Sequence, residues 1–551
     1  VLTLSLLSHL PFLTAPIVTG IDAQEHAGVP AVLVSFLRDW LPLSPQLVSW
    51  VGLLAFALLL RTTSKKPLKP RALVMTAALF FVMGAIIAAF LLKTNAIERV
   101  GDPRFVSRYP ALGRFLYIGM YLLFGIHEWP GRMTQLLLSA LAALYIYRIG
   151  TLFISERAGT ISAALLLFLP PLFHSGNLNM LDCGTVTLTV ALEFYLLRYL
   201  EESRRRDFCR ALLLLTAGVL YKKVLILMIP AAFLQWFIHA LIARRRLDVA
   251  EPAGFFLPAG TAVISMWFSS FNPDVPMRTS AYSIPFYYHW IDPTYFLAPL
   301  ARVSDALTWP ILILVPCGMI ISSIPRSKKW RWLRHALVWY ISYVFLYIAW
   351  ETPWNIRQAM PSYPPLLLLA AAGFDWLLSN SNRLTIRTAW GLLSAYLLWV
   401  VLLLPRSVPA PDHRPIKDHT WLNLTNEKAF YLPYPDMFHY LSRHLPRGAV
   451  IYAPMANEPS QFYLAAYRLR DHWQYLGDAW APTTDQTTEN LKHYCESNRV
   501  SYLLLPNRRW AQTTLSQQVL ESITNGPIEW LELDFTVVRG TEHLALYKVT
   551  E

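Results

Sequence analysis

Long apolar stretches and short basic loops alternate through the first 405 residues of the chain. Residues 72–92, for example, contain no charged side chain and lie between the basic segment 65–71 and Lys93. An α-helix needs about 20 predominantly apolar residues to cross the ~30 Å hydrocarbon core of a bilayer. Because the pattern recurs along the whole region, the sequence predicts a polytopic α-helical membrane protein.

We expect about 13 transmembrane helices within residues 1–405. Residues 1–19 have the length of a signal peptide, but they lack a basic leading region and a small-residue cleavage site, which favours a first membrane helix. The apolar spans lie near 1–19, 46–61, 72–92, 129–150, 158–173, 184–200, 208–221, 224–242, 254–270, 307–324, 335–350, 359–378 and 388–404.

Clusters of basic residues fall on alternate loops, which lie on one side of these spans. They occur at 61–71, 148–157, 204–206, 244–246, 326–334 and 383–387. Loops rich in Lys and Arg face the cytoplasm, so this side is predicted to be cytoplasmic. The other side, called the outer face below, carries the loops 20–45, 94–128, 174–183, 221–223, 271–306 and 351–358.

The composition agrees with a membrane protein. Hydrophobic residues make up 55% of the chain and charged residues 15%, which is too apolar for an ordinary soluble surface. The net charge of +13 lies mostly in the loops between spans, where it indicates topology and contact with anionic lipid. We therefore expect no nucleic-acid partner. The four cysteines are far apart, so they indicate neither a thiolate zinc site nor a disulfide framework.

The chain changes character after residue 405. A proline-rich linker follows, and residues 406–551 are predicted to form a separate soluble α/β domain on the outer face. Apolar runs predict strands, helical patterns lie between them, and their alternation predicts a partly parallel sheet. The runs are 449–452, 502–505 and 544–549, and the helical patterns are 436–445 and 487–497.

Two acidic positions on the outer face are candidates for catalysis, because ionisable groups at membrane depth are costly to keep. Asp22 follows the first span, with Glu25 and His26 beside it, and a carboxylate there can serve as general base toward an acceptor hydroxyl. Asp182 lies where the chain re-enters the membrane. Either aspartate can instead cap a helix, and the sequence leaves both readings open.

Basic residues on the same face are candidates for binding an anion. Arg108 can hold a phosphate through two hydrogen bonds, or it can extend toward lipid headgroups. Lys222 and Lys223 break the pattern of the basic loops because they fall on the outer face. Two ammonium groups there require an anion such as a lipid phosphate, unless they pair with internal acids.

Taken in order, these segments resemble the lipid-linked-sugar glycosyltransferases with the GT-C fold. The resemblance is greatest to aminoarabinose transferases of lipid A and protein O-mannosyltransferase relatives. The residues that carry it are Asp22, His26 and Ala27; Arg108–Leu112, Phe124–Gly125 and Arg132; Leu152–Phe153 and Arg157–Gly159; Asp182; Gly218 with Lys222 or Lys223; His289, Pro293 and Tyr295; and Arg357, Pro361 and Pro364–Pro365.

The sequence also departs from the family pattern. Ala23 stands where the family usually has a Glu, and an extra apolar hairpin at 46–92 separates Asp22 from Arg108. If this hairpin displaces the first outer loop, Glu98 and Asp102 become substitute acids. Ser107 replaces a Glu that ligates metal in some members. The resemblance leaves a divalent metal open, but this change argues against one, and no other cofactor is expected.

The resemblance implies an inverting transfer of a sugar from a polyprenyl-phosphate donor to a lipid, glycan or protein acceptor at the outer face of a bacterial inner membrane. In this reading Asp22 is the general base, and Asp182 orients the sugar or acceptor. Arg108, Lys222 or Lys223, and Arg357 bind the donor phosphate, with support from Glu25, His26, Asp102 and His289.

A second hypothesis is a non-catalytic subunit that kept the GT-C architecture and serves assembly of a membrane complex. The departures above favour it, whereas the retained Asp182 and the outer lysine pair oppose it.

Overall fold

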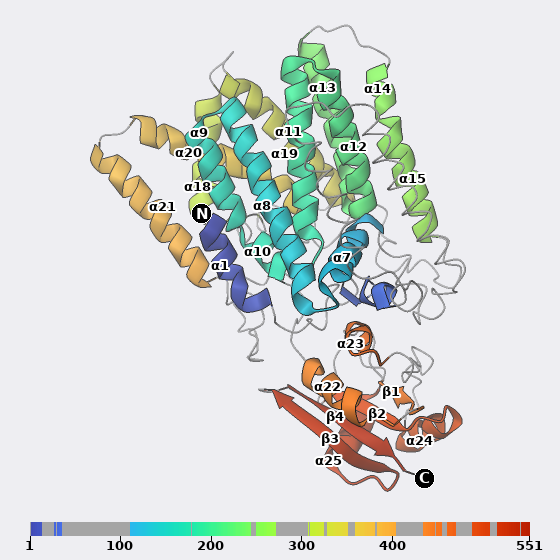
Figure 1. Ribbon diagram of the computed structural model, residues 1–551. Coiled ribbons are helices and arrows are strands. Elements are labelled where there is room, and N and C mark those ends of the chain that lie inside the picture. Colours follow the sequence, from blue (N-terminus) through green and yellow to red (C-terminus); the bar gives the residue numbers. More distant parts are fainter. Residues whose placement is uncertain are drawn as a thin grey trace.

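The computed structural model describes mainly helices in the first part of the chain and a mixed α/β unit at its end (Figure 1). The described residues are 2–13, most of 27–35, 111–243 without 178, 250–270, parts of 303–323, 328–350, most of 357–403, 433–469 without 447 and 454–459, 487–506, 515–539 and 542–550. The predicted spans 46–61 and 72–92 lie outside these residues.

The described part of the helical region consists of α-helices, with two short 3-10 helices, η1 and η2. Its elements are α1 (Leu2–Leu13), α7 (Ala111–Phe124), α8 (Glu128–Phe153), α9 (Glu156–Leu167), α10 (Pro170–Asn177), α11 (Asp182–Glu202), α12 (Arg205–Tyr221), η1 (Lys223–Leu227), α13 (Met228–Ile242), α14 (Ala250–Gly254), α15 (Phe256–Ser270), α18 (Trp309–Ser322), α19 (Lys328–Trp350), η2 (Met360–Ser362), α20 (Tyr363–Asn380) and α21 (Arg383–Leu403).

Every predicted span within the described residues contains a helix. Two stretches in this part of the chain are long and apolar enough to cross a membrane, α8 and η1 with α13, and the bent pair α9 and α10 would make a third. The prediction of about 13 membrane helices therefore stays a prediction. The pair α9 and α10 bends by 48° just before Pro170 and Pro171, which cannot continue the hydrogen bonding of the preceding helix.

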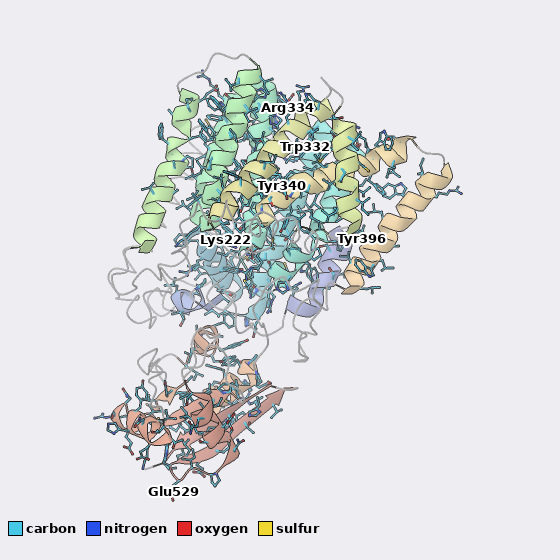
Figure 2. The ribbon with its side chains drawn as sticks, turned by 180° about the vertical axis from the view of Figure 1, so that it is seen from behind. Lys222, Trp332, Arg334, Tyr340, Tyr396 and Glu529 are labelled. Carbon is cyan, nitrogen blue, oxygen red and sulfur yellow. The ribbon has the colours of Figure 1, made fainter. Side chains whose placement is uncertain are left out.

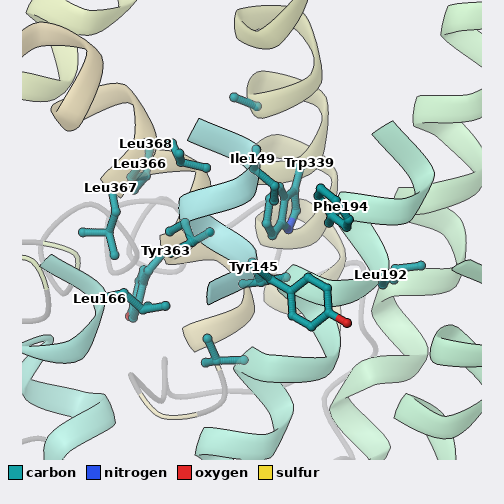
Figure 3. Packing of buried hydrophobic residues seen from close by; sticks show 14 of the residues in the cluster. Tyr145, Ile149, Leu166, Leu192, Phe194, Trp339, Tyr363, Leu366, Leu367 and Leu368 are labelled. Carbon is teal, nitrogen blue, oxygen red and sulfur yellow. The ribbon is translucent and has the colours of Figure 1, made fainter. Parts of the chain in front are cut away.

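Most of the described helices contribute to one apolar core. Figure 3 shows part of it, with Tyr145 and Ile149 from α8, Phe194 from α11 and Trp339 from α19. Helices α18 and α20 approach closely at Gly318, where an added Cβ would lie 1.8 Å from the carbonyl oxygen of Leu369. Small residues permit such close backbone contact between membrane helices.

The C-terminal residues form a four-stranded sheet with the order β1-β2-β4-β3. Strand β1 pairs in parallel with β2, and the other two pairs are antiparallel. The elements are α22 (Tyr434–His444), β1 (Ile451–Tyr452), α23 (Ser460–Ala466), α24 (Thr488–Ser497), β2 (Tyr502–Pro506), α25 (Gln517–Asn525), β3 (Leu531–Arg539) and β4 (Glu542–Val549).

Alternating side chains of the sheet enter two separate cores. Leu504 and Leu546 pack with α22 and α23, whereas Leu503 and Leu505 pack with α24 and α25. The period of two along a strand produces this division. On the first side, the core continues into the helical region, where Phe462 of α23 lies 6.0 Å, ring centre to ring centre, from Tyr121 of α7.

Thiol labelling tests the predicted orientation of this architecture. Cys209 is exposed in α12, beside the basic residues 204–206, whereas Cys183 and Cys495 are buried. Burial, with a smaller contribution from Glu496, also raises the pKa of the Cys495 thiol to about 12, which lowers its reactivity. An impermeant maleimide should label Cys209 only from the cytoplasmic side of sealed vesicles.

The matched variant is Glu532→Cys, at an exposed position of β3, which should react only from the opposite side. Labelling of both positions from the same side would contradict the predicted topology.

Candidate functional site

Three charged side chains from distant parts of the sequence meet at one end of the helical region. Lys222 donates a hydrogen bond from Nζ to Oδ1 of Asp182. On the other side of the carboxylate, Nε of Arg357 lies 3.4 Å from Oδ2 of Asp182. We call these residues the ion triad. Figure 2 shows Lys222 in the half of the helical region that is nearer the C-terminal sheet, and Arg334 in the opposite half.

The ion triad is almost completely buried. Asp182 is 0% exposed, Arg357 4% and Lys222 8%. A buried carboxylate requires paired cations or strong hydrogen bonds, since an isolated buried charge is very costly. Here one negative charge faces two positive charges, so the three residues together carry one net positive charge.

Helix ends position the members of the triad. Asp182 is the first residue of α11, and the preceding N-cap residue, Leu181, makes no side-chain capping bond. The carboxylate therefore lies at the positive end of the helix dipole, which favours its charge, and its oxygens contact the two cations. Lys222 follows the last residue of α12 with extended backbone angles, φ −152° and ψ 131°, and so leaves the helix axis toward Asp182.

Gly184 and Tyr221 fix the two sides of the triad against each other. A Cβ added at Gly184 would lie 2.1 Å from Oη of Tyr221, so the tyrosine ring packs directly on the backbone of α11. Gly184 is two residues after Asp182, and Tyr221 immediately precedes Lys222. The approach of the ring to α11 therefore brings Lys222 within reach of the carboxylate.

The side chain of Arg132, on α8, connects the ends of two other helices. Its Nε donates to the carbonyl oxygen of Asn177 at 2.7 Å, and its Nη1 donates to the carbonyl oxygen of Leu13 at 3.1 Å. These carbonyls end α10 and α1, where a helix has acceptors without internal partners and a partial negative charge. One buried guanidinium thus joins two helix ends to α8.

The connection between α10 and α11 turns sharply at Asn179. This residue has a left-handed backbone, φ +58°, which asparagine adopts more readily than most residues other than glycine. Its carbonyl oxygen accepts a hydrogen bond from Oη of Tyr117 at 2.9 Å. This contact holds the sharp turn that returns the chain to Asp182.

Four of the predicted site residues lie within the described part of the chain. Asp182, Lys222 and Arg357 come together, and Lys223 begins η1 beside them, partly buried. The remaining candidates, Asp22, Glu25, His26, Asp102, Arg108 and His289, lie outside the described residues. Within the described residues, no three His, Cys, Asp or Glu side chains are grouped as metal ligands.

Sequence reasoning did not identify the roles of Gly184, Tyr221 and Arg132. The contact of Gly184 with Tyr221 leaves no pattern in the sequence, because a glycine in a helix has many uses. The position of Arg132 at the start of a long apolar span was a signal, since a buried arginine in a membrane protein requires specific acceptors.

Comparison with known proteins supports the resemblance inferred from the sequence. Residues 109–268 match the family model of dolichyl-phosphate-mannose-protein mannosyltransferases. This region contains Asp182 and Lys222. Among curated proteins, no sequence matches the chain.

Solved structures give the fold. ArnT from Cupriavidus metallidurans in the apo state superposes with a TM-score of 0.51 at 14% identity, covering 80% of this chain and 87% of that one. The same enzyme bound to undecaprenyl phosphate gives 0.48 at 16% identity, over 80% and 88%. The Archaeoglobus fulgidus oligosaccharyltransferase in the apo form gives 0.47 at 11% identity, over 73% and 62%.

The helical region therefore resembles the membrane enzymes of the GT-C fold, and the resemblance to lipid-linked-sugar glycosyltransferases that the sequence predicts is confirmed.

The contact of Gly184 with Tyr221 predicts the effect of one methyl group. Gly184→Ala should force the ring away from α11 and destabilise the protein by about 1–3 kcal/mol, as expected for overpacking. Thermal unfolding in detergent measures the change. Gly119→Ala in α7 is the matched control, because no atom lies within 4 Å of its added Cβ.

Tyr221→Ala removes the ring that Gly184→Ala would meet. The double variant should therefore lose less stability than the sum of the two single losses. Additive losses, or a stable Gly184→Ala protein, would contradict the proposed contact.

Proposed function

We propose that the protein is a membrane glycosyltransferase that moves a sugar from a polyprenyl-phosphate donor to an acceptor at the outer face. The observation that carries this proposal is the meeting of Asp182, Lys222 and Arg357 at one end of the bundle. A lipid phosphate supplies the negative charge that a site with two cations and one carboxylate attracts. Undecaprenyl phosphate is the lipid bound by the structurally similar ArnT.

Lys222 is the member of the triad that an incoming phosphate meets. Its side chain keeps 10% of its surface exposed, whereas that of Asp182 has 0% and that of Arg357 has 4%. An ammonium group has three N–H donors, and Asp182 accepts from one of them. The other two are suited to oxygens of the donor phosphate.

The burial of Asp182 gives it a different role from the one that the resemblance implies. A carboxylate without exposed surface does not reach an acceptor, so Asp182 is assigned as a positioning residue that holds Lys222 and Arg357 at the phosphate. Asp22, in the first outer loop, keeps the role of general base.

In the proposed transfer step, one bond forms, one bond breaks and one proton is transferred. An acceptor hydroxyl attacks the anomeric carbon from the face opposite the phosphate, and its proton passes to the Asp22 carboxylate. The bond between the anomeric carbon and the phosphate oxygen breaks, with inversion at that carbon. The lipid phosphate leaves with its new charge stabilised by Lys222 and Arg357. The acceptor is a lipid, a glycan or a protein, and Arg108 and Lys223 add positive charge at the site.

The C-terminal domain packs against the part of the helical region that contains the ion triad. Its helix α23 packs against α7, and the shared core includes Leu181 and Tyr221, the chain neighbours of Asp182 and Lys222. We assign this domain to the outer side of the membrane, where it covers the site and receives the acceptor.

The closure of the ion triad also favours a second candidate function. Lys222 and Arg357 both contact the carboxylate of Asp182, and all three side chains are nearly excluded from solvent, as expected for a GT-C-like subunit that has kept the fold without the reaction. Such a subunit would act in the assembly of a membrane complex.

Binding and transfer by the purified full chain separate these functions. Undecaprenyl phosphate should bind to the wild type, and Lys222→Met should weaken binding at least about tenfold, equivalent to about 1.4 kcal/mol. Lys492→Met, a partly exposed lysine of α24, is the control and should leave binding unchanged.

Transfer from labelled polyprenyl-phosphate sugars to membrane acceptors is the second measurement. Asp22→Asn should reduce the rate about 10²-fold or more, as expected for loss of a general base. Binding without any transfer would support the non-catalytic subunit. Absence of both activities in the wild type would contradict the enzyme proposal.

A further inference from the structure

A second polar contact inside the bundle joins α11, which carries Asp182, to α13. Gln235 of α13 donates a hydrogen bond from Nε2 to Oε1 of Glu193 in α11 at 2.8 Å. Glu193 is 0% exposed and Gln235 1%. The sequence analysis did not select Glu193, although an acid inside an apolar span is a candidate for a specific role.

Each side chain of this pair has one further oxygen atom, and these two atoms indicate the protonation state of Glu193. Oε2 of Glu193 and Oε1 of Gln235 are both buried and have no hydrogen-bond partner within the described part of the chain. Glu193 also forms no ion pair there. An ionised carboxylate in this position would be a buried charge without a cation, which is very costly.

One proton resolves both unpaired atoms. If Glu193 carries a proton on Oε2, its O–H can donate to Oε1 of Gln235. The acid and the amide then form two parallel hydrogen bonds, each group donating once and accepting once. We infer that Glu193 is a neutral carboxylic acid that forms this paired clip with Gln235 and fixes the register of α11 against α13.

The clip lies at a fixed separation from the ion triad along both segments. Glu193 is eleven residues after Asp182 on α11, and Gln235 is thirteen residues after Lys222, through η1 and α13. At 1.5 Å per helical residue, the first separation is about 16 Å. Asp182–Lys222 and Glu193–Gln235 therefore join the same two segments at two depths.

Two such connections prevent the segments from sliding past each other. A shift of α13 along α11 would separate Gln235 from Glu193 and would move Lys222 relative to Asp182. Glu193 and Gln235 are accordingly positioning residues for the proposed phosphate site, and this consequence rests on the proposed function. The protonation of Glu193 and its pairing with Gln235 do not depend on the proposed function.

Infrared spectroscopy tests the protonation directly. At neutral pH, the difference spectrum between the wild type and Glu193→Gln should contain the C=O stretch of a protonated carboxyl group, which the variant lacks. Carboxylate bands in its place would overturn the inference.

Thermal stability tests the pairing with matched variants. Glu193→Gln, and the exchange Glu193→Gln with Gln235→Glu, should unfold within about 2 °C of the wild type, because both keep a neutral pair with two hydrogen bonds. Gln235→Leu should lower the melting temperature by at least about 3 °C, since it leaves the buried acid without its partner. The double variant Glu193→Leu with Gln235→Leu should recover most of that loss, because it removes both polar groups.

A strongly destabilised exchange variant, or a Gln235→Leu protein as stable as the wild type, would overturn the pairing. The register is tested by undecaprenyl phosphate binding, which the exchange variant should keep and the double leucine variant should weaken at least threefold. Equal binding by these two variants would refute the positioning role. If the wild type binds no undecaprenyl phosphate, the proposed function and this positioning role fail, while the infrared and thermal results still decide whether the clip exists.

Discussion

The buried carboxylate of Asp182 is the interaction on which the site-bearing end of the helical region depends. It is fully excluded from solvent and contacts both Lys222 and Arg357. Loss of one partner from a buried ion pair typically costs about 3–5 kcal/mol, since it leaves an uncompensated charge. This cost requires that α11, the end of α12 and the segment before η2 keep one arrangement.

Other contacts, which do not include the residues of the ion triad, support the same arrangement. Tyr221 packs on Gly184, Arg132 joins the ends of α1 and α10 to α8, and the Glu193–Gln235 contact joins α11 to α13 at greater depth. These contacts restrict the triad from different directions. A site that stabilises a leaving phosphate benefits from such restriction, because charged groups already in position need no reorganisation during the reaction.

The sequence predicted the helices well, because long apolar spans between basic loops are a strong signal. It also placed the division between α12 and η1 at residues 221–224, although that junction has no long loop. Of the described site, Asp182 and Lys222 were predicted because charges at membrane depth are rare, whereas Arg357 was predicted only through the resemblance to GT-C glycosyltransferases. The sequence left open that the outer lysines pair with internal acids, and Lys222 does pair with Asp182. It could not show which acid meets which cation, since that depends on helix rotation and on close packing at Gly184. The Glu193–Gln235 contact was accessible in part, because an acid within an apolar span is visible in the sequence, whereas its partner on another helix is not.

The central claim is that the ion triad binds the phosphate of a polyprenyl lipid. An experimental structure of the full chain with undecaprenyl phosphate in a lipid nanodisc tests it most directly. We expect the phosphate oxygens within about 4 Å of Nζ of Lys222, with Arg357 on the far side of the same group and Asp182 still buried behind both. A well-ordered lipid phosphate bound elsewhere, with Lys222 closed on Asp182 and covered by protein, would contradict the account.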